Sequence, residues 1–136
     1  MSKPSNLQAL DVLIVDDEAD IRELVAGILS DEGYHTRTAG DSDSALREIR
    51  ARRPALVILD IWLQGSRLDG LQVLDEIKKD NPDLPVLVIS GGSPMIDVDF
   101  LLVAKQFGAV EILRKPFEPK ELTSALARLA GQPAAA

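Results

Sequence analysis

The sequence contains no cysteine, which excludes disulfide bonds and thiolate metal sites. Aromatic residues make up only 4% of its 136 residues, and there is a single histidine. No apolar run approaches the roughly 20 residues that are needed to cross a bilayer. The N-terminal segment MSKPSNLQAL also lacks the apolar stretch of a signal peptide. We therefore expect a cytoplasmic protein that has no membrane partner.

Positive charge is also scarce, because 15 lysine and arginine residues stand against 22 acidic ones, which gives a formal net charge of −7. Proteins that bind nucleic acids usually carry a basic face, since neutralising phosphates supplies most of their affinity. The longest basic run is RARR at positions 50–53, which is more typical of a solvated helix end. We therefore expect no nucleic acid among the partners.

Hydrophobic residues are plentiful, at 46% of the sequence, and the length suits one ordinary domain. Short apolar runs alternate with stretches in which apolar residues recur every three or four positions, as in amphipathic helices. We expect strands at 11–15, 34–39, 55–59, 85–90 and 111–114. We expect helices over 21–29, from Asp41 or Asp43 to before Pro54, over 71–77 and 100–107, and a last one that carries 122–129. The domain should span 10–130, with an N-terminal tail at 1–9 and a C-terminal tail or linker start at 131–136.

This alternation of strands and helices predicts a parallel sheet with helices on both faces. The strand at 34–39 is polar and contains the single histidine, His35, so it belongs at an edge with His35 facing solvent. Right-handed crossovers limit the remaining topologies. We expect an α/β fold with a doubly wound five-stranded parallel sheet, flavodoxin-like, in the order 2-1-3-4-5. Ligands bind such sheets beyond the carboxyl ends of the strands, between strands one and three.

Side chains with useful chemistry follow the inner strands of this predicted sheet. They are Asp16 and Asp17 after the first strand, Asp60 as the first residue beyond the third, Ser90 at the end of the fourth and Lys115 after the fifth. Carboxylates about 5 Å apart repel by on the order of 3 kcal/mol per pair at an effective dielectric constant of about 20, unless a cation lies between them. Hard oxygen ligands favour Mg²⁺. Such a set suits phosphoryl transfer, in which Asp60 attacks in line to give an aspartyl-phosphate.

Each of these residues alone has a simpler explanation as a helix cap or a turn residue, but four strand ends carry suitable residues in a suitable order. Three other functions fit the sequence less well. A phosphatase with an aspartyl nucleophile needs a second aspartate at position 62, where this chain has a tryptophan. A non-phosphorylated interaction module would not need the intact set. Flavin binding needs a Ser/Thr-rich phosphate loop where this chain has DDEAD.

The segments LIVDDEADIRELV, LVILDIWL, LDGLQVLDEIK, VLVIS and LRKPFEPKEL resemble the motifs of response regulator receiver domains of bacterial two-component systems, over residues 11–129. The resemblance implies that Asp60 takes a phosphoryl group from a histidine kinase or a histidine phosphotransfer protein in a Mg²⁺-dependent step. Phosphorylation would then switch the binding of a downstream protein effector. The chain would be a signalling phosphoacceptor of a phosphorelay, and no enzyme beyond its own phosphorylation and dephosphorylation.

The resemblance also implies a role for each site residue. Asp17, Asp60 and the backbone carbonyl of Trp62 would bind Mg²⁺ directly, and Asp16 would act mostly through metal-bound water. Ser90 would be the switch hydroxyl and Lys115 the phosphoryl-binding lysine. In this family the bond between Lys115 and the following proline is typically cis, an isomer that costs little before proline.

The chain departs from the common family pattern in three places. The loop after Asp60 is longer than usual, and together with LVAGILSDEGYHTRTA it resembles the receivers of NtrX-type nitrogen-regulation proteins. The region between Ser90 and Lys115 is also longer and includes GGSPMIDVD, which does not look NtrX-like. Ile112 stands where the family commonly has an aromatic switch residue. We therefore expect the loop at 91–99 to carry more of the conformational change.

Proteins of the NtrX type continue into an ATPase domain and a DNA-binding domain, for which this chain has no room. We therefore expect either a stand-alone receiver or an excised one. A homodimer would use the face formed by the helix at 100–107, the strand at 111–114 and the last helix.

Overall fold

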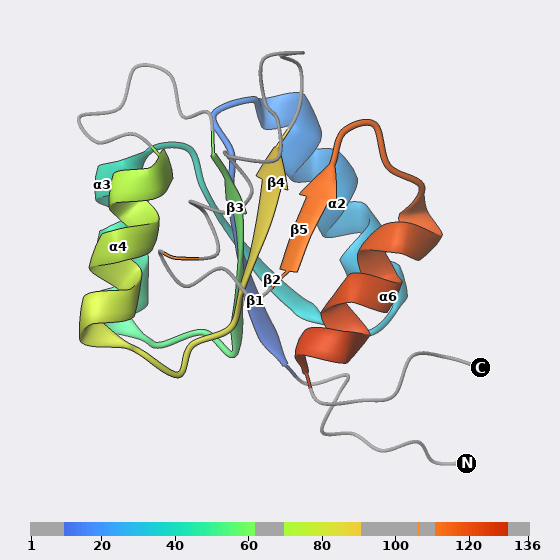
Figure 1. Ribbon diagram of the computed structural model, residues 1–136. Coiled ribbons are helices and arrows are strands. Elements are labelled where there is room, and N and C mark those ends of the chain that lie inside the picture. Colours follow the sequence, from blue (N-terminus) through green and yellow to red (C-terminus); the bar gives the residue numbers. More distant parts are fainter. Residues whose placement is uncertain (1–9, 62–69, 91–105, 107–110, 131–136) are drawn as a thin grey trace.

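The computed structural model describes residues 10–61, 70–90, 106 and 111–130, and it shows a five-stranded parallel sheet between two layers of helices (Figure 1). In chain order the elements are β1 (Asp11–Val15), α2 (Ala19–Asp31), β2 (His35–Ala39), α3 (Ser42–Ala51), β3 (Leu56–Asp60), α4 (Gly70–Asp80), β4 (Val86–Ser90), β5 (Glu111–Arg114) and α6 (Pro119–Leu129). The strand order is β2-β1-β3-β4-β5, as predicted. The predicted helix at 100–107 lies, apart from residue 106, outside the described residues.

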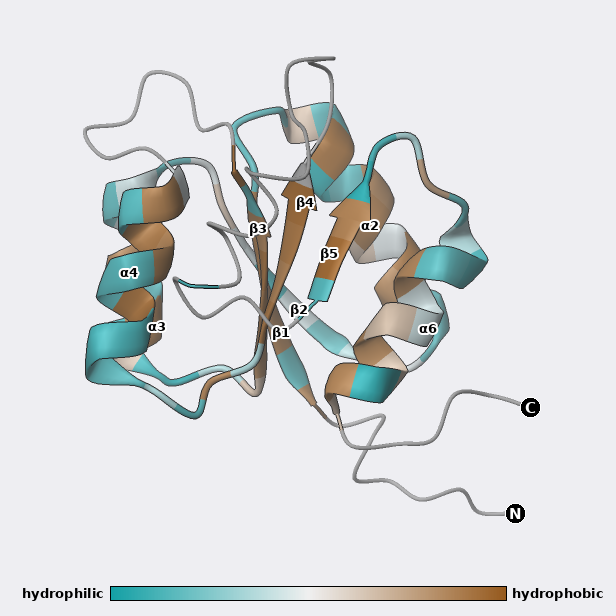
Figure 2. Ribbon diagram, viewed as in Figure 1, coloured by the Kyte–Doolittle hydropathy of each residue, from teal (hydrophilic) through white to brown (hydrophobic). Residues whose placement is uncertain are grey.

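Helices α3 and α4 cover one face of the sheet, and α2 and α6 cover the other (Figure 1). Successive residues of β1 alternate between the two cores: Leu13 packs in the core under α3 and α4, whereas Val12 and Ile14 pack in the core under α2 and α6. Because both faces are covered, the inner strands β1, β3 and β4 are apolar over most of their length, as Figure 2 shows. No helix in the described part of the chain is long and apolar enough to span a membrane.

The polar strand β2 lies at an edge of the sheet, and His35 is exposed, as predicted. The strand begins at His35, one residue later than predicted. The reason is that Tyr34 still belongs to the turn that ends α2, in which its N–H donates to the carbonyl of Leu29 at 3.0 Å. Gly33 has a φ of 96°, the left-handed conformation that commonly ends a helix.

Asp60 is the last residue of β3, so the expectation that it follows the strand was wrong. It pairs with Ile89 of β4, and the N–H of Ile61 donates to the carbonyl of Ile89 at 3.0 Å. The hydrogen-bonded ladder therefore extends beyond Leu59, where the apolar run ends. As a consequence, the carboxylate of Asp60 is attached to a backbone that is hydrogen-bonded within the sheet. Such a backbone holds a side chain more rigidly than a loop does.

Candidate functional site

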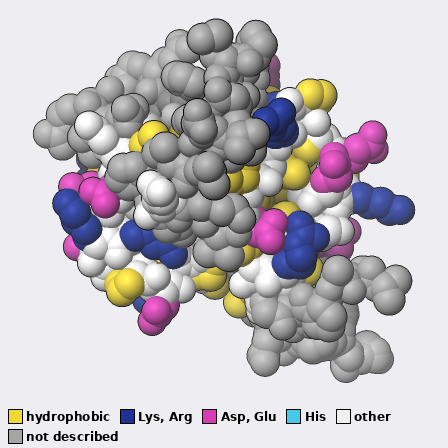
Figure 3. All heavy atoms as spheres, viewed as in Figure 1, with side chains coloured by type: hydrophobic (Ala, Val, Ile, Leu, Met, Phe, Trp, Pro, Cys, Tyr) yellow, Lys and Arg dark blue, Asp and Glu magenta, His cyan; other side chains and the backbone are white. Residues whose placement is uncertain are grey.

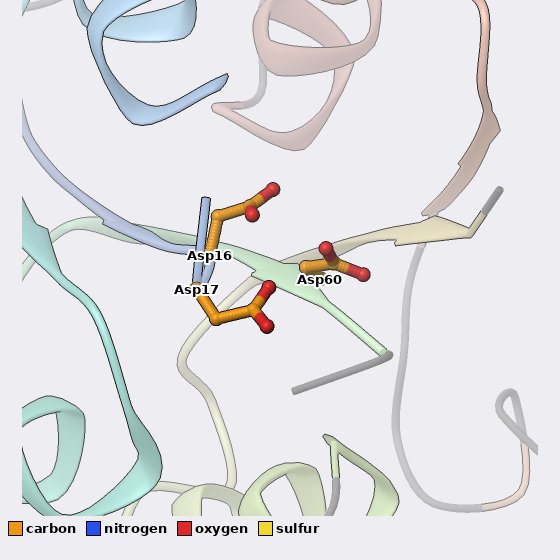
Figure 4. A group of neighbouring side chains, drawn as sticks. All are labelled: Asp16, Asp17 and Asp60. Atoms are coloured by element: carbon orange, nitrogen blue, oxygen red, sulfur yellow. The ribbon is translucent and has the colours of Figure 1, made fainter. Parts of the chain in front are cut away.

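Three carboxylates lie together at the carboxyl ends of β1 and β3, as Figure 4 shows for Asp16, Asp17 and Asp60. One oxygen from each residue lies within 4.8 Å of the others. Asp16 and Asp60 are 2% and 4% exposed, and Asp17 is half-buried. The sequence predicted this cluster, because β1 and β3 are neighbours at the point where the strand order reverses.

Most polar groups of Asp16 are engaged by its surroundings. Its N–H donates to the carbonyl of Ala39 at 3.2 Å, and its carbonyl accepts from Nη1 of Arg22 at 2.7 Å. Its Oδ1 accepts from the N–H of Glu18 at 2.9 Å. By contrast, Oδ2 is buried and has no hydrogen-bond partner among the described residues. Asp16 therefore presents to the cluster one oxygen that lacks a hydrogen bond.

Lys115 reaches the cluster from the end of β5. Its Nζ donates to Oδ2 of Asp60 at 3.3 Å and lies 3.5 Å from Oδ2 of Asp16. Burial lowers the pKa of Lys115, but the negative charges of Asp60, Asp16 and Glu18 outweigh this effect and raise the pKa above its ordinary value. The side chain is therefore a cation at neutral pH. The bond between Lys115 and Pro116 is cis, as predicted.

The residues of the cluster fit a hard divalent cation. Three carboxylates against one lysine leave an excess of negative charge, and carboxylates this close repel by on the order of 3 kcal/mol per pair at an effective dielectric constant of about 20. The donors are all oxygens, which suit Mg²⁺, Ca²⁺ or Mn²⁺ better than soft metals. The buried Oδ2 of Asp16, without a hydrogen bond, is an atom that such an ion or its water would satisfy. This group of aspartates could therefore hold a metal ion.

Two further predicted site residues are less fully placed. Ser90 is the last residue of β4, directly after Ile89, which pairs with Asp60, so its backbone lies at the same end of the sheet. The role of its hydroxyl stays a prediction. Trp62 and the loop at 91–99 lie outside the described residues, so the carbonyl ligand and the predicted movement of that loop stay predictions too.

Sequence reasoning assigned no role to Arg22 or Gly70, although both lie close to the cluster. Gly70 begins α4 and packs against the backbone of Ile61 so tightly that a Cβ on it would overlap the carbonyl of Ile61. Gly70 is therefore in contact with Ile61, the residue directly after Asp60 in the chain. The DG pair at 69–70 was a visible signal for the glycine. Arg22 left no such signal, because its acceptor is a backbone carbonyl.

Comparison with known proteins places these features in a family. The family model of the response regulator receiver domain matches residues 12–127. The nitrogen assimilation regulatory protein NtrX of Azorhizobium caulinodans is 56% identical over 114 residues, which cover 84% of this chain and 24% of that protein. The DNA-binding response regulator MtrA of Mycobacterium leprae is 34% identical over 113 residues, which cover 83% of this chain and 48% of that protein.

A solved structure agrees with both the fold and the sequence. The crystal structure of the receiver domain of NtrX from Brucella abortus is 54% identical and superposes with a TM-score of 0.84, covering 90% of this chain and 100% of that one. The chain spans only about a quarter of the curated NtrX relatives, 24% and 25% of the first two. Since the family model runs from β1 into the last helix, over the strands that bring the aspartates and the lysine together, this chain belongs to the family of response regulator receiver domains, the signalling modules of two-component systems.

Proposed function

We propose that this chain accepts a phosphoryl group on Asp60 in a step that depends on Mg²⁺. The observation that supports this most directly is the position of the Asp60 carboxylate, buried at the end of β3 with Nζ of Lys115 3.3 Å away. Asp16 and Asp17 lie beside it. Catalysis of phosphoryl transfer is almost entirely positioning and charge neutralisation, so a fixed nucleophile next to a fixed cation is a suitable arrangement.

In the transfer, a carboxylate oxygen of Asp60 forms a bond to phosphorus while the bond between phosphorus and the donor histidine nitrogen breaks. The electron pair of that bond returns to the nitrogen, and the product is an aspartyl-phosphate. Lys115 balances negative charge on the phosphoryl oxygens, and the hydroxyl of Ser90 hydrogen-bonds one of them. When bound, Mg²⁺ neutralises charge on those oxygens. Its ligands would be Asp17, Asp60 and the carbonyl of Trp62, with Asp16 acting through water.

The donor would be a histidine kinase or a histidine phosphotransfer protein, and the output would be altered binding of a downstream protein effector. In this role the chain is a signalling phosphoacceptor and not an enzyme that turns over a substrate. Because a relative at 56% identity is named a nitrogen assimilation regulatory protein, we propose a signalling pathway of that kind. The cytoplasmic location, the domain bounds 10–130 and a homodimer stay predictions.

The surface in Figure 3 suits a protein partner. On the described part of this face, positive side chains lie among negative ones. Ion pairs among the described residues include Lys79 with Asp75 at 3.4 Å and Arg128 with Glu111 at 3.2 Å. A surface of alternating charge offers complementary contacts to another protein, whereas nucleic acid is best met by a continuous basic face. We propose protein partners on this ground.

Labelling with acetyl phosphate and Mg²⁺ tests the proposal. Intact-mass measurement should show one added phosphoryl group on the wild-type chain and none on Asp60→Asn. A chelator should abolish the labelling. The matched control is Asp43→Asn, which changes an exposed carboxylate of α3 and should be labelled as fast as wild type. Labelling of Asp60→Asn at the wild-type rate would show that the acceptor lies elsewhere.

The cognate donor requires a separate experiment. A panel of sensor kinases that have been autophosphorylated with labelled ATP, and of histidine phosphotransfer proteins that have been labelled by such kinases, should include members that transfer label to wild type and not to Asp60→Asn. Transfer to both chains, or acceptance from no member while acetyl phosphate labels Asp60, would contradict the proposed donor class.

A further inference from the structure

We propose that Arg22 is a positioning residue for the metal-binding carboxylates and acts through the backbone of Asp16. The proposal rests on the proposed function and deepens it. Arg22 lies at the start of α2, and its Nη1 donates to the carbonyl oxygen of Asp16 at 2.7 Å. That carbonyl belongs to the peptide unit that joins Asp16 to Asp17. A single side chain therefore holds the link between two of the three clustered carboxylates.

The sheet alone does not hold this peptide unit. Strand β1 ends at Val15, and beyond it the N–H of Asp16 still donates to the carbonyl of Ala39 at 3.2 Å. The carbonyl of Asp16, in contrast, accepts from the side chain of Arg22. Because a peptide unit is planar, fixing its carbonyl also fixes the direction in which the chain enters Asp17. The hydrogen bond from Arg22 thus orients the residue that is proposed to bind the metal directly.

Gly40 lies next to the guanidinium of Arg22. A Cβ on Gly40 would lie 3.0 Å from Nη1 of Arg22, 3.5 Å from its Cζ and 3.8 Å from its Nη2. The guanidinium therefore lies against the bare backbone of the turn between β2 and α3. A Cβ at position 40 would require the guanidinium to move by a few tenths of an ångström, and we expect this shift to weaken its hydrogen bond to the carbonyl of Asp16.

The effect of Arg22 should fall on metal affinity. The carbonyl of Asp16 accepts a hydrogen bond from Arg22, and its Oδ1 accepts one from the N–H of Glu18 at 2.9 Å. These two hydrogen bonds limit the conformations of the Asp16 side chain and leave Oδ2 facing the cluster. Groups that orient metal ligands typically change metal affinity by 10-fold to 100-fold. The attacking carboxylate belongs to Asp60, on another strand, so the transfer step itself should change little once the metal is bound.

The test is a Mg²⁺ titration of the whole chain, followed by the amide signals in NMR spectra. Arg22→Met should bind Mg²⁺ about 10-fold more weakly than wild type. Its labelling rate with acetyl phosphate at saturating Mg²⁺ should stay within about twofold of wild type, since only affinity is affected. Arg22→Lys keeps a donor and should recover part of the loss. Gly40→Ala should weaken binding by a smaller factor, about threefold, because the guanidinium can partly adjust.

Gly27→Ala is the matched control, because it is also a glycine-to-alanine change, in α2, and a Cβ there meets nothing within 4 Å. Its Mg²⁺ affinity should equal that of wild type. If Gly40 acts through Arg22, adding Gly40→Ala to Arg22→Met should weaken binding no further.

Two results would overturn the proposal in different ways. If wild type binds Mg²⁺ and Arg22→Met binds it equally well while only its melting temperature falls, then Arg22 is merely structural. The same conclusion follows from unchanged affinity in Gly40→Ala, which keeps the test decisive if Arg22→Met does not fold. If wild type itself binds no Mg²⁺, the proposed function fails, and the role of Arg22 fails with it.

Discussion

The two ends of β1 carry groups of charges that are built in opposite ways. Near the amino end, Arg37 of β2 donates to both carboxylate oxygens of Asp11 at 3.2 and 2.7 Å, and to Oε1 of Glu48 at 3.0 Å. It also donates to the carbonyls of Glu48 and Arg52. We call this group of Arg37, Asp11, Glu48 and Arg52 the closed cluster, because each charge in it has a partner.

The group of Asp16, Asp17, Asp60 and Lys115 at the carboxyl end is the open cluster. Here Asp16 and Asp60 share Lys115, Asp17 lies beside them, and Oδ2 of Asp16 has no hydrogen bond among the described residues. Hydrogen bonding to Asp11 raises the pKa of Arg37 against the opposing effect of burial, so the closed cluster is satisfied by the protein alone. A divalent cation would offset the excess of negative charge in the open cluster. The closed cluster is therefore satisfied within the fold, and the open cluster has the composition of a site that could hold a cation.

Gly70→Ala should cause the largest loss of stability, because the added Cβ would push the backbone of residue 70 away from that of Ile61, beside the open cluster. A Cβ at position 70 overlaps the backbone of Ile61, next to Asp60. We expect a fall of about 3 kcal/mol in the free energy of unfolding, as for severe overpacking, and loss of labelling by acetyl phosphate. Urea unfolding and intact-mass measurement check both. Gly27→Ala, with open space around its Cβ, should be labelled normally. Normal labelling of Gly70→Ala would show that the contact with Ile61 does not position Asp60.

Arg37→Met should separate the two clusters most clearly. It leaves Asp11 and Glu48 without their shared partner, and we expect a loss of about 2 kcal/mol in the free energy of unfolding. This is less than for a fully buried pair, because Arg37 and Asp11 are 16% and 21% exposed. Phosphorylation of the folded protein should not change. Arg50→Met is the control, since its pair with Asp80 is more than half exposed on both sides and should matter by less than about 0.5 kcal/mol. Equal losses in the two variants would remove the distinction between a closed cluster and an ordinary surface pair.

The open cluster could be predicted from the sequence, and the closed one could not. Asp16, Asp17, Asp60 and Lys115 follow apolar runs, and the parallel fold brings the carboxyl ends of its strands to one edge. Arg37 and Arg22 gave no such signal, because several of their acceptors are backbone carbonyls, which every residue has. Nothing in the spacing of charged residues reveals a contact that depends on the direction of a carbonyl group.

The limits of the strands illustrate the same point. The apolar pattern predicted five strands in the observed order, but it placed Asp60 after β3, since a carboxylate looks like the end of a buried run. The pairing of β3 with β4 nevertheless includes Asp60, which pairs with Ile89, because the backbone N–H and C=O groups form hydrogen bonds whichever side chain the residue carries. Similarly, the sequence left Asp41 and Asp43 as alternative caps for α3, and the contact with Ser44 identifies Asp41.

Binding of Mg²⁺ at the open cluster should raise the free energy of unfolding of the protein, by less than the effects expected for Gly70→Ala and Arg37→Met. At a Mg²⁺ concentration tenfold above the dissociation constant, binding to the native state alone raises the free energy of unfolding by about 1.4 kcal/mol. Thermal unfolding with and without Mg²⁺ should show this increase in wild type and in Arg37→Met, and not in Asp17→Asn. Ca²⁺ or Mn²⁺ in place of Mg²⁺ would test how selective the oxygen donors are. Equal stabilisation of Asp17→Asn would mean that the ion acts elsewhere.

The smallest effect is expected at Asp41, which lies on the carboxyl side of the sheet but resembles the closed cluster, because its partners satisfy it. Its Oδ1 accepts from the N–H of Ser44 at 2.7 Å and from Oγ of Ser44 at 2.8 Å. Asp41→Ala removes this helix cap and should lower the free energy of unfolding by about 1 kcal/mol at neutral pH, with no change in Mg²⁺ affinity. Asp43→Ala, in the first turn but not at the cap, should cost less, about 0.3 kcal/mol.

The pH dependence of that loss identifies its cause. The hydrogen bonds from the N–H and Oγ of Ser44 lower the pKa of Asp41 below its ordinary value. A carboxyl group whose pKa is lower in the folded state stabilises the fold above its unfolded pKa of about 3.9, and this contribution disappears as the pH falls through the folded pKa. Urea unfolding at several values from about pH 6 to about pH 3 should therefore show the gap between wild type and Asp41→Ala shrinking as acid is added. If the gap stayed constant over that range, the ionised carboxylate would not be what caps the helix, and the loss would have to come from the backbone preference of the residue at position 41.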